Sequence, residues 1–232
     1  MIDRQDGGIS VPYKYQVFLN HPFDEAFEPL AHAMHFAVVA AGLVPLCAID
    51  TSLPDEPRLQ KLVSMITSCR YSVHDLSRYK GEGERNFARF NMPIEVGMAL
   101  YYTFSTEHKE HRCLTVVETE HDYKRFASDL AGLDLKCHND DDRLMLTVVF
   151  DWLRKVKAGQ AGGIATAEVQ EKYQDFLKTL KRVKGSGKDG QPTHDEVQEV
   201  MFRECLEYRW WDWRSNSVFK VLFPELPISW KS

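Results

Sequence analysis

The chain has 232 residues, of which 44% are hydrophobic and 27% are charged, and these are the proportions of a globular protein with a sizeable core. Its formal net charge of −5 disfavours non-specific binding to nucleic acid and attachment to a membrane through a polybasic segment. The first residues hold no apolar core of signal-peptide length, and no stretch reaches the roughly 18 apolar residues of a membrane span.

Short apolar runs bounded by polar or turn residues recur along the first 140 residues. Each one is typical of a buried strand in a parallel sheet. The predicted strands are Tyr15–Asn20, Leu43–Ile49, Tyr71–Ser77, Arg112–Glu118 and the short run Leu133–Cys137.

Segments with apolar residues at helical spacing separate these strands. They predict helices over Asp24–Ala41 (ended by Gly42), about 59–66, 90–106, about Asp122–Ala131 and about Asp140–Lys157. Alternating strands and helices imply right-handed crossovers and a mainly parallel sheet that is covered on both faces. Four or five strands in this length predict an α/β, flavodoxin-like fold with strand order 2-1-3-4-5.

The sequence changes character after this series. We expect an α/β domain over residues 1–157 and, after a glycine-rich loop, a C-terminal helical appendage over residues 164–232 that ends in an aromatic-rich tail. The appendage contains two amphipathic helices, and neither can bury its apolar face alone. They are therefore predicted to pack on the domain or to build a homo-oligomer.

One carboxylate stands out within the segment RFNMPIEVGMALYYTFST. Glu95 is the only charged side chain between Phe90 and Thr106, and its apolar neighbours are typical of a helix buried on most of its circumference. A buried carboxylate costs several kcal/mol unless it is compensated or functional. Asn91 is predicted to cap this helix, and the helix dipole together with Arg78 or Arg89 is expected to keep Glu95 ionised.

Polar residues also follow the first three predicted strands, at the edge where parallel sheets bind ligands. These residues are Asn20 and His21, Asp50, and the group His74, Asp75, Ser77 and Arg78. Glu95 and Asn91 share a face near the start of their helix, at the same edge. Each residue also has an ordinary structural interpretation, as a dipole complement, a turn former, an interior histidine or an ion partner of Glu95.

Other chemistries find little support. No phosphate-cradling loop or nucleophile elbow is present, and no spacing of Cys and His matches a metal site, so no metal is predicted. The five cysteines are dispersed and odd in number, which suits buried thiols in a reducing compartment. We therefore expect a cytoplasmic location.

The blocks VFLNHPFDEAFEPL, CRYSVHDLSR and RFNMPIEVGMAL resemble the bacterial TIR-like proteins, which share a flavodoxin-like sheet with TIR domains. MPIEVGMA together with HPF is similar to the nucleoside 2-deoxyribosyltransferases. The resemblance covers about Tyr15 to Leu153. Many TIR enzymes carry Trp and Cys before the helix Glu, where this chain has Asn91 and Met92.

The resemblance implies an NAD glycohydrolase or ADP-ribosyl cyclase, which would act in bacterial antiphage defence or signalling, often as a homo-oligomer. NAD would be the substrate, and no cofactor is implied. Glu95 would stabilise the ribosyl cation or form a transient ester, Asn20 and Asp75 would bind ribose hydroxyls, and Arg78 or Arg89 would meet the pyrophosphate. The remaining substrate contacts would come from His21, Pro22, Phe23, Asp50, Ser77 and Asn91.

Two alternatives stay open. A nucleoside 2-deoxyribosyltransferase or nucleotide N-glycosidase would need a group that protonates the departing base, and His21 or Asp75 is available. A non-catalytic module would bind a nucleotide-like signal or a protein through the same crevice.

Overall fold

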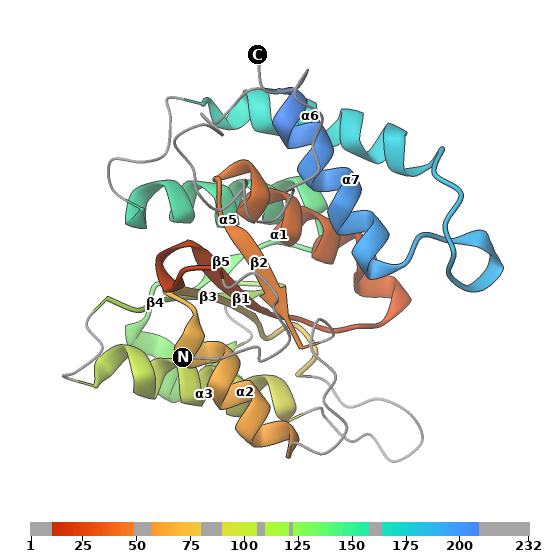
Figure 1. Cartoon of the computed structure of the whole chain (residues 1–232). Coiled ribbons are helices and arrows are strands. Elements are labelled where there is room, and N and C mark those ends of the chain that lie inside the picture. The colour runs from red at the N-terminus through yellow and green to blue at the C-terminus, as the bar shows by residue number, and fades with distance from the viewer. Residues whose placement is uncertain are drawn as a thin grey trace.

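A five-stranded, all-parallel sheet with the order β2-β1-β3-β4-β5 forms the centre of the computed structural model, which confirms the predicted α/β class and strand order (Figure 1). The structure describes residues 11–48, 57–79, 90–105, 110–120, 123–157 and 164–208. The strands are β1 (Gln16–Asn20), β2 (Val44–Cys47), β3 (Tyr71–Asp75), β4 (Arg112–Val117) and β5 (Lys136–Cys137).

Helices follow the strands as the alternating pattern predicts. They are α1 (Glu28–Ala40), α2 (Arg58–Ser68), α3 (Asn91–Phe104), α4 (Tyr123–Phe126), α5 (Asp142–Val156), α6 (Thr166–Leu180) and α7 (His194–Glu207). No helix in these described ranges combines the length and apolar composition that crossing a membrane requires.

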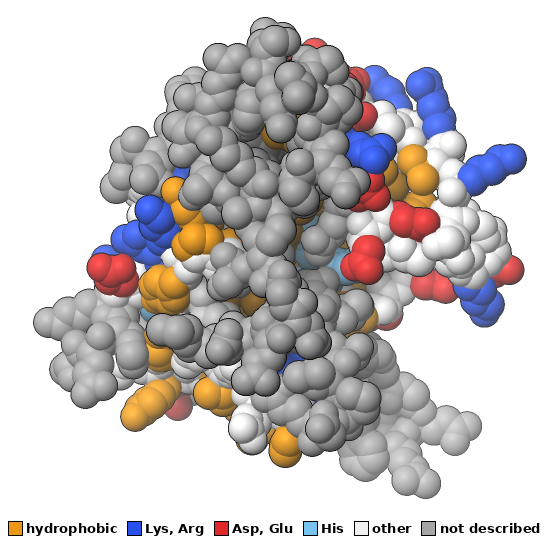
Figure 2. Space-filling view, viewed as in Figure 1, with side chains coloured by type: hydrophobic (Ala, Val, Ile, Leu, Met, Phe, Trp, Pro, Cys, Tyr) orange, Lys and Arg blue, Asp and Glu red, His pale blue; other side chains and the backbone are white. Residues whose placement is uncertain are grey.

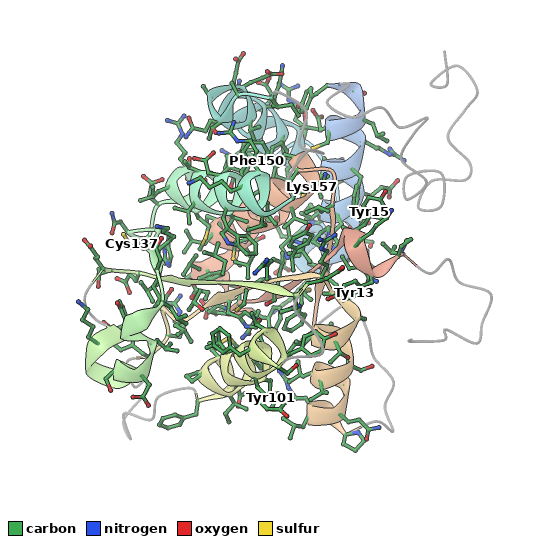
Figure 3. The ribbon with its side chains drawn as sticks, turned by 90° about the vertical axis from the view of Figure 1, so that its left-hand side faces the viewer. Tyr13, Tyr15, Tyr101, Cys137, Phe150 and Lys157 are labelled. Atoms are coloured by element: carbon green, nitrogen blue, oxygen red, sulfur yellow. The ribbon has the colours of Figure 1, made fainter. Side chains whose placement is uncertain are left out.

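The helices form layers on both faces of the sheet. Helices α1 and α5 cover one face, α2 and α3 cover the other, and α6 and α7 lie outside α1 and α5 (Figure 1). Side chains alternate along β1 accordingly, because Val17 and Leu19 join the core under α1 whereas Phe18 joins the core under α2. Figure 3 shows Phe150 of α5 and Tyr101 of α3 on opposite sides of the sheet.

Helix α1 is buried almost all round, which the one-sided pattern in its sequence does not predict. Every residue from Ala33 to Ala40 is buried, because the sheet covers one side of the helix while α5, α6 and α7 cover the rest. Tyr173 and Phe176 of α6 and Met201 of α7 belong to the same hydrophobic core as α1. The appendage helices therefore pack on the α/β part, which is one of the two predicted arrangements; the division at residue 157 stays a prediction.

Helix α3 differs from expectation. It buries a single stripe, Met92, Glu95, Val96 and Ala99, and so it is not covered on most of its circumference. Apolar side chains on its other faces stay exposed, with Ile94 at 51% and Tyr101 at 79%. The sheet and α2 pack against this helix, and its Met92 and Val96 share a small core cluster with Tyr123 of α4, whereas α1 has larger elements on several sides.

Two local predictions are also wrong. Asn91 does not cap α3, because the helix begins so that Phe90 is the cap residue and Asn91 is already the first helical residue. The helix predicted over 122–131 is α4 followed by a 3-10 turn at Ser128–Gly132, separated by the non-helical Ala127. Ser128 and Asp129 favour such breaks because their side chains compete for backbone groups.

Candidate functional site

The carboxyl ends of β1 and β3 meet the start of α3. Asn20 and His74 are paired in register at the ends of these strands. The Asn20 side-chain Nδ2 lies 3.1 Å from Nδ1 of His74 and donates to the carbonyl oxygen of Met92 at 3.4 Å. These three segments therefore meet at one edge of the sheet, as predicted, and Asn20 links them.

Glu95 lies one turn after Met92, on the buried stripe of α3. Its side chain is only 3% exposed, and among the described residues it makes no hydrogen bond or ion pair. Burial raises the pKa of Glu95 from 4.5 to about 7, and the positive charge of Arg58, at the start of α2, opposes this shift. The expectation that charge partners would outweigh burial is thus wrong, since desolvation dominates.

His74 is fully buried beside this edge. Its Nδ1 accepts from the Asn20 amide, so the ring proton lies on Nε2, which has no hydrogen-bond partner among the described residues. Burial and the neighbouring His111 lower the pKa of His74 to about 3. The ring is therefore neutral near neutral pH, and its Nε2–H is available as a donor.

Asp75 and Ser77 project to the other side of the sheet, where they contact His138 after β5. Ser77 donates through its hydroxyl to Asp75 Oδ1 at 2.5 Å, and Ser77 Oγ lies 2.9 Å from His138 Nε2. Because the Asp140 backbone N–H donates to His138 Nδ1, Nε2 carries the ring proton and donates toward Ser77. A serine nucleophile needs the opposite arrangement, in which the histidine accepts the hydroxyl proton. This buried trio therefore joins the ends of β3 and β5 and does not form a catalytic triad.

The other predicted contacts are spread around the edge. Arg78 pairs with Asp24 at 2.9 Å, and Phe23 is 44% exposed. Asn91 is exposed at the start of α3, one turn from the buried Glu95. Asp50 and Arg89 lie outside the described residues.

A second polar cluster, which the sequence analysis missed, lies on the α1 side of the edge. His21 Nδ1 lies 2.8 Å from the carbonyl oxygen of Pro22, and His21 Nε2 lies 3.1 Å from Nε2 of His35 in α1. Cys47, at the end of β2, lies 3.5 Å from Nε2 of His194 in α7. Burial, with the neighbouring histidines His21, His194 and His32, holds the pKa of His35 well below its ordinary value, so this ring is neutral. These residues are too far apart in the sequence for their spacing to indicate a common site. The predicted strand order places only the ends of β1 and β2 side by side.

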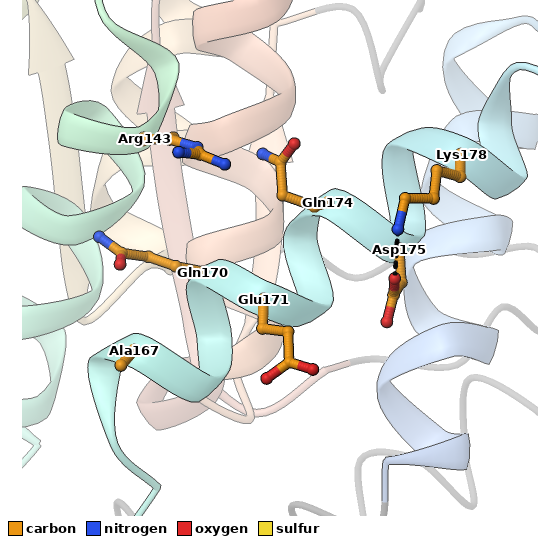
Figure 4. A pocket seen from close by; sticks show the side chains of 7 residues that line it. All are labelled: Arg143, Ala167, Gln170, Glu171, Gln174, Asp175 and Lys178. Atoms are coloured by element: carbon orange, nitrogen blue, oxygen red, sulfur yellow. Dashed lines mark hydrogen bonds and ion pairs between the residues drawn. The ribbon is translucent and has the colours of Figure 1, made fainter.

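A pocket lies elsewhere, between α5 and α6 (Figure 4). Its lining is polar and of mixed charge, and Asp175 there pairs with Lys178 at 3.0 Å. The pocket is on the side of α5 that points away from the sheet. Glu95 belongs to α3, which covers the opposite face of the sheet. This pocket therefore adds nothing to the Glu95 site.

Comparison of the chain with protein-family models, with curated proteins and with solved structures gave no match in any of the three. The fold class thus follows from the sheet itself, and the functional argument depends on the residues at its edge.

Proposed function

We propose that the chain cleaves the nicotinamide–ribose bond of NAD, as a glycohydrolase or ADP-ribosyl cyclase of the TIR-like kind. The observation that carries the proposal is the Glu95 carboxyl group, which is 3% exposed and has no partner among the described residues. A buried carboxyl group without compensation destabilises the fold, so its presence at a ligand-binding edge favours a catalytic role. The resemblance of the HPF and MPIEVGMA blocks to enzymes acting at an anomeric carbon supports the same role.

In the proposed reaction, the bond between the ribose anomeric carbon and the nicotinamide nitrogen breaks. The electron pair leaves with nicotinamide and neutralises its ring charge, so no general acid is required. The ribosyl group becomes an oxocarbenium ion, which the Glu95 carboxylate stabilises until water or a nitrogen of the adenine ring attacks.

Asn20 is the neighbour best suited to hold the ribose. Its amide nitrogen is fixed by His74 and Met92, while its Oδ1 makes no hydrogen bond among the described residues and can accept from a ribose hydroxyl. Asp75 is left out of this role because Ser77 and His138 already contact its carboxylate.

The raised pKa of Glu95 favours one alternative, cleavage or transfer at a nucleoside N-glycosidic bond. A carboxyl group that holds its proton up to about pH 7 can give it to a departing base, which the NAD reaction does not need. His21 is less suited to this task, because both of its ring nitrogens face protein groups.

Incubation of the chain with NAD and, separately, with deoxynucleosides, followed by chromatography of the products, tests the proposal. We expect nicotinamide with ADP-ribose or a cyclic isomer from NAD, and loss of about 10²-fold or more in turnover for Glu95→Gln. The exposed Glu171→Gln on α6 is the matched control and should keep full activity. Thermal stabilisation by NAD without any product would indicate that the chain binds NAD and does not cleave it.

A further inference from the structure

The polar cluster on the α1 side of the sheet gathers metal-ligating side chains. His21, His35 and Cys47 each offer one ligand atom, and these atoms all lie within 4.8 Å of one another. All three side chains are buried, with exposed fractions of 3%, 3% and 0%. His194 of α7 stands next to Cys47.

We propose that His21, His35 and Cys47 bind a divalent transition-metal ion of the zinc class. His194 is not assigned as a ligand, because its Nε2 already accepts from the Gln198 side-chain amide at 2.8 Å. Imidazole and thiolate ligands select such ions over Mg²⁺ or Ca²⁺, which prefer oxygen. The site is independent of the function proposed for Glu95, which lies on the opposite side of the sheet.

The separations of the side chains suit a tetrahedral ion. With bonds of about 2.0–2.1 Å to nitrogen and about 2.3 Å to sulfur, two nitrogen ligands lie about 3.3 Å apart, and a nitrogen and a sulfur lie about 3.6 Å apart. The nitrogen pair of His21 and His35 is separated by 3.1 Å, which is close to the edge of such a tetrahedron. The sulfur of Cys47 lies within 4.8 Å of a ligand nitrogen of each histidine.

Hydrogen bonding also orients the His21 ring for metal binding. The Pro22 carbonyl can only accept, so Nδ1 of His21 carries the ring proton and Nε2 presents its lone pair to His35. Among the described residues, the buried Nδ1 of His35 has no hydrogen-bond partner. The Nε2 of His35 faces the lone pair of His21 Nε2 and donates to it in the metal-free chain, and a bound ion would take the place of this proton between the two nitrogens.

The ligands come from three separate elements, namely the ends of β1 and β2 and the middle of α1. Bound metal would therefore fasten α1 to the edge of the sheet. Histidine side chains (pale blue) and acidic side chains (red) lie next to each other on the face that includes α7 (Figure 2). Binding releases the thiol proton of Cys47 as the thiolate forms its bond to the ion.

Cobalt titration of the full chain, after chelation and removal of the chelator, tests the site. We expect saturation at equimolar Co²⁺, with a thiolate-to-cobalt charge-transfer band and the strong d–d bands of tetrahedral cobalt. Zn²⁺ should abolish this spectrum by displacement and raise the melting temperature. A folded chain, checked by circular dichroism, that takes up neither ion would overturn the proposal.

Variants separate the ligands from their neighbours. Cys47→Ser should remove the charge-transfer band, whereas Cys69→Ser, a fully buried thiol on the other face of the sheet, should keep it. His35→Gln should weaken Co²⁺ binding at least about 10-fold. His32→Gln, on the same helix as His35, should leave affinity unchanged. Retention of the band in Cys47→Ser, or unaltered affinity in His35→Gln, would contradict the assigned ligands.

Discussion

At the scale of single residues, the edge of the sheet holds polar groups whose roles follow from their partners. Asp75 is held by Ser77 and His138, and Asn20 joins His74 to α3. Glu95 is the exception, because burial acts on its carboxyl group without a compensating bond among the described residues. Its ionisation should therefore be visible both in stability and in activity.

The stability of the protein should depend on pH through Glu95. The folded-state pKa of about 7 lies above the ordinary 4.5, so the native state holds this proton more tightly than the unfolded chain. The stability contributed by the protonated group is full below about pH 4.5 and is lost as the pH rises through about 7. Glu95→Gln should thus melt near the wild-type temperature at pH 4.5 and above it at pH 8. A difference that stays constant across this range, as expected for Glu171→Gln, would contradict the raised pKa.

The rate of NAD cleavage should rise with pH through about 7, because the proposed reaction needs the carboxylate. Arg58→Gln removes a cation that lowers the pKa of Glu95, so its rate profile should shift to higher pH, while Arg58→Lys should overlay the wild type. Profiles of the three proteins measured in parallel decide the matter. A rate that instead falls above pH 7 would indicate that Glu95 acts as an acid, as the nucleoside alternative requires.

At the scale of elements, the start of α7 shows how the local sequence fixes a helix end. Thr193 and Glu196 form a complete capping box at the start of α7, with the Thr193 side chain accepting from the Glu196 N–H and the Glu196 carboxylate accepting from the Thr193 N–H. This cap fixes the turn that also carries His194. The local sequence thus sets where α7 begins, at the point where it contacts the sheet edge.

Thr193→Ala should therefore lower the free energy of unfolding by about 1 kcal/mol, because the first turn of α7 loses a side-chain acceptor. Urea denaturation followed by circular dichroism measures the change. Thr67→Ala is the control: Thr67 is exposed within α2, and alanine is the better helix former there. Equal effects of the two substitutions would mean that the capping box contributes nothing.

At the scale of the whole molecule, the outer helices complete the core. Helix α1 lies between the sheet and the α6–α7 layer, and Phe36 of α1 packs against Tyr173 and Phe176 with ring centroids 5.4 and 5.3 Å away. Without the outer layer, these rings would face water. The appendage is thus part of what makes the α/β unit stable.

Removal of residues 185–232 should expose apolar surface on α1 and α6 and cause aggregation, seen by size-exclusion chromatography with light scattering. The point variant Met201→Ala, at a fully buried site in α7, should cost about 2–5 kcal/mol in stability. Glu207→Ala, exposed at the end of the same helix, should change stability by less than about 0.5 kcal/mol. A truncated chain that stays monodisperse and melts as before would show that α7 is dispensable.

The sequence by itself determined the alternation of strands and helices, the strand order and the meeting of Asn20, His74 and the start of α3 at one edge. It could do so because apolar periodicity and the rules for parallel crossovers are local or topological. Tertiary structure alone decided which faces are covered, and hence that α1 is buried all round and α3 only along one stripe. It also decided the pKa of Glu95, since desolvation depends on everything packed around a group. For the same reason, the meeting of His21, His35, Cys47 and His194 had no signal in the sequence, because it requires α7 to fold back over β2.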